Sequence, residues 1–65
     1  MKKMFEGLSG AEAYATNSSK KHNTDRFVAK SKVLNTGIRY FVYEKLEDIE
    51  EGEKLLSHFK NGVRQ

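Results

Sequence analysis

Two runs of β-branched and aromatic residues around a glycine turn constrain this fold more than any other feature of the sequence. The runs cover residues 27–34 and 38–43, and Asn35, Thr36 and Gly37 lie between them. A three-residue loop with glycine last is typical of a type I turn followed by a bulge, because glycine takes the left-handed conformation at little cost. The sequence therefore predicts a β-hairpin over residues 26–45.

The turn also sets a register for the hairpin. We expect Leu34 to pair with Ile38, and side chains of cross-strand partners lie on the same face. One face then carries the better core candidates, which are Phe27, Ala29, Ser31, Val33, Arg39, Phe41 and Tyr43. The second face mixes lysines with a tyrosine and aliphatic residues, and is the expected solvent or ligand face. It carries Val28, Lys30, Lys32, Leu34, Ile38, Tyr40 and Val42.

The last third of the chain carries the signals of a helix start. Asp48 and Glu51 match a capping box, and acidic residues crowd the first turn, where the helix dipole favours them. Apolar residues then recur at helical spacing, namely Ile49, Leu56, Phe59 and Val63. We therefore expect a C-terminal helix over residues 48–60 that covers one face of the sheet, with Phe41 and Leu56 in the core.

The first 25 residues leave two interpretations open. Ser9 and Glu12 could form a capping box for a short helix, whereas the alternation of small and larger residues over 11–16 suits a strand. The strand is favoured by context, because a hairpin alone is marginally stable and needs a third strand or a partner. We expect one α+β domain of residues 1–65: a small antiparallel sheet, with a third strand near 11–16, packed on the C-terminal helix. Residues 1–10 and the polar stretch 17–25 are the expected loop or mobile segments.

Composition argues against catalysis and for a small intracellular module. The 65 residues contain no cysteine, and two histidines cannot alone complete a structural zinc site. Neither a phosphate-binding glycine loop nor a poised catalytic set is recognisable. The chain carries no long apolar run and no secretion signal. We therefore expect a cytoplasmic, non-enzymatic protein without cofactor or metal.

Charge is divided unevenly along the chain and points to an acidic partner. Residues 1–43 hold eight Lys or Arg against three acids, whereas residues 44–65 hold six acids against four bases. Phosphates are attracted to clustered bases, and exposed aromatic rings among them can stack on nucleobases. The expected nucleic-acid-binding residues are Lys30, Lys32 and Tyr40 on the second hairpin face, with further contacts from Lys20 and Lys21.

Residues 26–56, which read RFVAKSKVLNTGIRYFVYEKLEDIEEGEKLL, resemble the core of the AP2/ERF and integrase arm-binding domains. The resemblance rests on a hairpin strand before a glycine turn and on the passage from the last strand through Leu46 and Asp48 into the acidic segment. It implies three strands, a C-terminal helix and DNA binding, with contacts falling on Lys30, Lys32, Tyr40 and Val42. The family's first strand is rich in arginine, whereas residues 11–16 are not.

A protein-binding function is the competing expectation. A small phage- or mobile-element-type inhibitor or adaptor could dock a basic partner through acidic residues, for which the candidates are Glu47, Glu50 and Glu51. Homodimerisation is a further alternative, because one helix would leave the second sheet face partly apolar.

Overall fold

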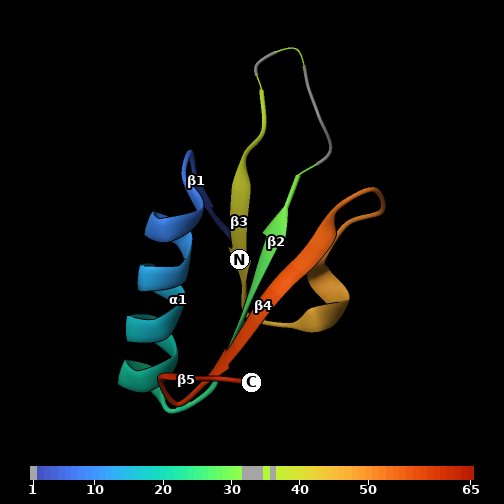
Figure 1. The fold of residues 1–65 in the computed structure, drawn as a ribbon. Coiled ribbons are helices and arrows are strands. Elements are labelled where there is room, and N and C mark those ends of the chain that lie inside the picture. The colour runs from blue at the N-terminus through green and yellow to red at the C-terminus, as the bar shows by residue number, and fades with distance from the viewer. Residues whose placement is uncertain (1, 32–34, 36) are drawn as a thin grey trace.

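The computed structural model describes residues 2–31, 35 and 37–65, and within these residues five strands form one antiparallel sheet. The order along the chain is β1 (Lys2–Phe5), α1 (Leu8–His22), β2 (Asp25–Lys30), β3 (Tyr40–Tyr43), the 3-10 helix η1 (Leu46–Asp48), β4 (Lys54–Lys60) and β5 (Val63–Arg64). The order across the sheet is β1-β3-β2-β4-β5. Helix α1 lies on one side of the sheet, and the segment containing η1 lies on the other (Figure 1).

The protein is α+β, but the expected C-terminal helix over residues 48–60 is wrong. Residues 46–48 form one 3-10 turn and residues 54–60 form β4, which pairs with β2 over most of its length. Gly52 adopts a φ of 89°, a left-handed conformation that ends any helix begun at Asp48. Pairing with β2 then provides hydrogen-bond partners for the backbone N–H and C=O groups of residues 54–60. Contacts between distant residues therefore override the acidic helix-start signal.

The expected third strand near residues 11–16 and the expected loop at 17–25 are also wrong, because α1 occupies residues 8–22. The capping position of the helix is Gly7, which has no side chain to cap it, so Ser9 does not act as the capping residue. The buried Ser19 makes hydrogen bonds both within the polar second half of the helix and to the turn before β5. The Ser19 hydroxyl donates to the Thr16 carbonyl at 3.0 Å and accepts the Gly62 N–H at 2.9 Å. Polar residues therefore pack within the helix instead of forming a loop.

The two hairpin segments do pair antiparallel, in a register two residues away from the expected one. Lys30 lies opposite Tyr40, and Phe27 lies opposite Tyr43. A shift of two residues keeps the same side chains together on each face. Lys32, Val33, Leu34 and Thr36 lie outside the described residues, and Gly37 has a positive φ of 99°.

The main core forms on the opposite face of the hairpin from the one expected. Small residues of α1 let the helix approach closely over the face that carries Val28 and Val42. The buried cluster consists of Ala11, Ala15, Val28, Val42 and Phe59, with Phe5 and Tyr40 packed against it. Neither Phe41 nor Leu56 is fully buried, because both lie away from this cluster.

The face of the sheet that points away from α1, here called the far face, is partly covered by residues 46–53. Tyr43, only 2% exposed, donates a hydrogen bond from its hydroxyl to the Glu53 carboxylate. The Lys2 ammonium donates to Glu50 at 2.9 Å. The connection before β4 is thus fastened to the sheet by its acidic residues.

In the part of the chain that the structure describes, no helix is long and apolar enough to cross a membrane.

Tyr43 makes the stability of this packing sensitive to high pH. Burial and the neighbouring Glu53 carboxylate raise the pKa of Tyr43 above its ordinary value of 10.0. Above pH 10 the unfolded chain therefore releases this proton before the folded chain does, and the free energy of unfolding falls. We expect urea titrations to show less of this alkaline loss in Tyr43→Phe than in the wild type, with exposed Tyr14→Phe as the control. An equal loss in Tyr43→Phe and the wild type would contradict this account of Tyr43.

Candidate functional site

Two adjoining cavities run between α1 and the strands β1 and β3, and together they are called the α1 groove. The first has a volume of about 260 Å³ and the second about 620 Å³. They share Tyr14, Arg26 and Glu44. The first is also lined by Lys2, Lys3 and Val42, and the second by Ser18, His22, Thr24 and Lys45. Bases and hydroxyl groups dominate this lining.

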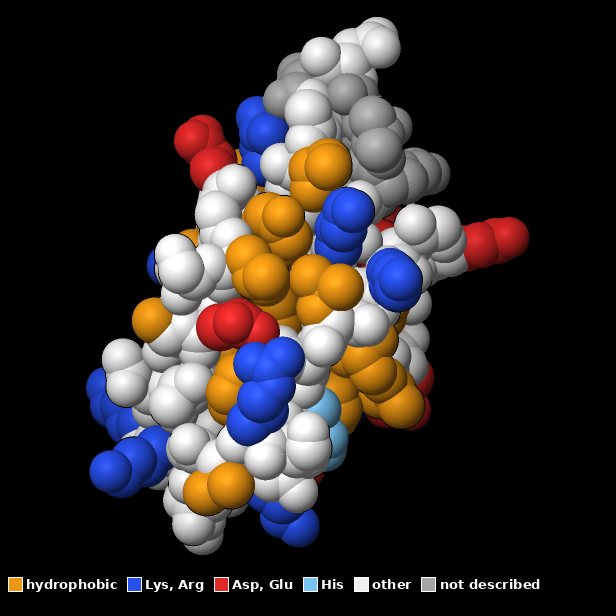
Figure 2. Space-filling model, in the orientation of Figure 1, with side chains coloured by type: hydrophobic (Ala, Val, Ile, Leu, Met, Phe, Trp, Pro, Cys, Tyr) orange, Lys and Arg blue, Asp and Glu red, His pale blue; other side chains and the backbone are white. Residues whose placement is uncertain are grey.

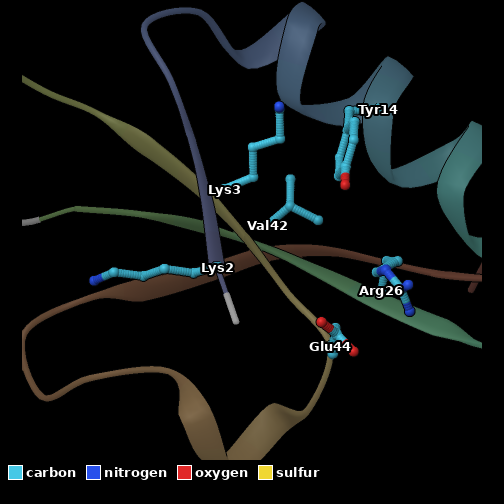
Figure 3. Close-up of a pocket in the computed structure, with 6 residues that line it drawn as sticks. All are labelled: Lys2, Lys3, Tyr14, Arg26, Val42 and Glu44. Atoms are coloured by element: carbon cyan, nitrogen blue, oxygen red, sulfur yellow. The ribbon is translucent and has the colours of Figure 1, made fainter.

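The two walls of the groove follow from the periodicities of helix and sheet. Tyr14, Ser18 and His22 are four residues apart, so they form one stripe along α1. Val42 and Glu44 lie two residues apart on and just after β3, and so share the face that points towards α1. Figure 3 shows the helix above the cavity and the strands below it.

Arg26 is held in a fixed position at the centre of the groove. Its Nε donates to the Ser18 hydroxyl at 3.0 Å, and its Nη1 donates to the Asp25 carbonyl at 2.8 Å. A guanidinium carries five N–H donors in a rigid plane and stays charged, so these two bonds leave donors for an anion. Arg26 is thus a fixed cation that lines both cavities, and the Glu44 carboxylate lies in the same lining.

Lys3 lines the first cavity and lies beside Tyr14, which both cavities share. The Lys3 ammonium lies 5.4 Å from the centre of the Tyr14 ring, and Tyr14 is 38% exposed. The Tyr14 ring also packs against Phe5, with ring centres 5.4 Å apart. The neighbouring Lys2 points away from the cavity in Figure 3 and lies over the Phe41 ring on the far face. Strand alternation therefore directs Lys3 alone of this pair into the groove.

The acidic residues of the chain gather elsewhere. Five of its nine Asp and Glu residues fall within 47–53, the segment on the far face. Lys3, Arg26 and Lys45 line the groove, with Glu44 as its carboxylate among the described lining residues. Figure 2 shows that further basic side chains lie on the face that β4 turns to the reader, among apolar and uncharged surface, and that one of them lies against an acidic side chain. The groove thus brings three basic side chains and an aromatic ring together in one lining.

The structure brings only some of the sequence-predicted residues together. Lys30 and Tyr40 are cross-strand partners, but Tyr40 packs against the core instead of standing free on an open face. Lys20 and Lys21 are exposed in the last turn of α1. Tyr40 pairs with Phe5, which lies just before α1 begins, so the two groups lie at opposite ends of that helix. Lys32 lies outside the described residues.

The acidic candidates do not form the expected helical face. Glu47 lies in η1, and Glu50 and Glu51 lie in the turn that comes after it. All three are exposed, and Glu50 accepts the hydrogen bond from Lys2. They form an acidic turn on the far face, separate from the groove.

Three groove cations, Lys3, Arg26 and Lys45, escaped sequence reasoning. The only signal for the groove was the spacing of Tyr14, Ser18 and His22, which becomes visible only if the helix is extended through residue 22.

The described residues contain no group of three or more His, Cys, Asp or Glu that could hold a metal ion. Comparisons with protein-family models, curated proteins and solved structures found no match, so the function must be inferred from the geometry of the groove.

Proposed function

We propose that this protein is a nucleic-acid-binding module that contacts phosphates through the α1 groove. The observation that carries the proposal is the convergence of Lys3, Arg26 and Lys45 on one groove that also contains an aromatic ring. Backbone phosphates supply most of the affinity of such modules, and fixed arginines bind them with two parallel hydrogen bonds. The sequence also favoured nucleic-acid binding, but it placed the contacts on the second face of the hairpin.

The separation of charge across the molecule supports this orientation. The acidic turn lies on the far face and would repel a polyanion approaching from that side. The net charge of +3 gives a modest overall attraction, so the local arrangement of bases must supply the rest. The groove therefore presents the favourable approach for a phosphate backbone.

Fluorescence anisotropy with labelled oligonucleotides, single-stranded and duplex, tests the proposal. We expect binding at low salt whose affinity falls steeply as salt rises, because each phosphate contact releases bound counterions. A folded protein that binds neither oligonucleotide at low salt would remove the proposed function.

The acidic turn, which is the candidate surface for a basic protein partner, gives the proposed function a second test. Exposed Glu47 and Glu51 lie beside Leu46, which is 54% exposed, and such a surface suits a basic protein partner. We expect Glu47→Lys/Glu51→Lys to leave nucleic-acid affinity unchanged or raised, because the change removes repulsion on a face outside the groove. A large loss of affinity in the same anisotropy assay would place the binding surface on the acidic turn instead.

A further inference from the structure

We infer that the α1 groove binds a single strand of nucleic acid, with one base stacked on Tyr14, and does not bind a duplex in the same way. This inference rests on the proposed function and adds the class of nucleic acid and the residue that selects it. The observation behind it is the position of the Tyr14 ring inside the groove, between α1 and the strands (Figure 3).

Tyr14 is suited to stacking because its ring is oriented by the fold and still accessible. Contact with Phe5 fixes the orientation of the ring, and 38% of the residue remains exposed. Stacking on a rigid ring costs little side-chain entropy, and every base has a π-face that can use it. A base inside a duplex is already stacked on its neighbours, so only an unpaired base can reach a ring within a groove.

The cations around Tyr14 are placed for the backbone of the same strand. The Lys3 ammonium lies over one face of the Tyr14 ring, 5.4 Å from its centre, so a base that stacks on this face takes the place of the ammonium, and the flexible lysine side chain then turns to the phosphate of the same nucleotide. Arg26 lines both cavities and can bind the next phosphate along the groove. Base and backbone would thus be recognised side by side, as in grooves for single strands.

The length of the groove suits a short stretch of one strand. Tyr14 and His22 are eight residues apart on α1, which corresponds to about 12 Å along the helix axis. Phosphates of one stacked strand are spaced by about 3.4 Å along its axis, so the groove spans roughly three nucleotides. Lys45 and His22 at the far end would meet the backbone as it leaves the groove.

Tyr14→Trp makes the stacking directly measurable, because the chain contains no other tryptophan. The variant is titrated at low salt with three ligands of equal length: single-stranded oligo-dT, an abasic strand with the same phosphates, and a duplex. We expect oligo-dT to bind most tightly and to quench the tryptophan fluorescence, and the abasic strand to bind more weakly without quenching. In the otherwise wild-type chain, Tyr14→Ala should bind oligo-dT about tenfold or more weakly, once circular dichroism has shown that it is folded. Tyr14→Phe should lose little affinity.

The outcomes separate this inference from the proposed function. Equal binding of all three ligands without quenching, or unchanged oligo-dT affinity in Tyr14→Ala, would overturn the stacked single strand while leaving phosphate binding in place. Binding of none of the ligands by wild type and variant would overturn the proposed function itself.

Discussion

Phe59→Ala should leave this protein largely unfolded at room temperature. Phe59 is 6% exposed and is the largest side chain in the buried cluster beneath α1. Truncating a buried phenylalanine costs about 3–5 kcal/mol. A domain of this length is stable by roughly 3–10 kcal/mol, so the loss removes much or all of its stability. Circular dichroism during a urea titration measures the effect.

Val63→Ala provides the matched control, because Val63 lies on the edge strand β5 and is 62% exposed. Its truncation should change the free energy of unfolding by less than about 0.5 kcal/mol. A cooperative transition of Phe59→Ala close to that of the wild type would mean that α1 does not pack on this face of the sheet.

Lys3→Gln/Lys45→Gln should weaken nucleic-acid binding on the order of a hundredfold at about 50 mM salt. Each lost phosphate contact lowers the logarithm of the affinity by about one at that salt, and two groove lysines are removed. Both side chains are exposed, so the fold should be little affected. Lys54→Gln/Lys60→Gln is the control, since both lysines are exposed on β4 and neither lines the groove. Its affinity should change only severalfold, and an equal loss in both variants would show that total charge alone determines binding.

The hairpin strands could be predicted from sequence because their signal is local. Residues 27–30 and 40–43 are mostly β-branched or aromatic, and they pair as strands in the structure. Their register could not be predicted, because it depends on how the connection closes. The Ser31 hydroxyl accepts the Arg39 N–H at 2.8 Å, and the Ser31 N–H donates to the Arg39 carbonyl at 2.8 Å, which fixes a pairing two residues from the expected one.

The helix was placed at the wrong end of the chain because the decisive contacts are between distant residues. The acidic segment after Asp48 carries helix-start signals, but β2 provides a ladder that draws residues 54–60 into the sheet. The polar stretch 17–22 lacks an apolar stripe, yet Ser19 is fully buried through its bond from Gly62. Pairing between residues so far apart leaves little trace in local propensity, and the groove between α1 and the sheet could not be foreseen without it.

The salt dependence of oligo-dT affinity in the two double-lysine variants tests the central claim most directly. Affinity is measured by anisotropy over a series of salt concentrations for wild type, Lys3→Gln/Lys45→Gln and Lys54→Gln/Lys60→Gln, all confirmed to be folded. If the α1 groove holds the phosphates, the plot of log affinity against log salt should become less steep by about two units in the groove variant. In the control variant its slope should stay at the wild-type value. Equal slopes in the two variants would contradict the assignment of the α1 groove as the binding site.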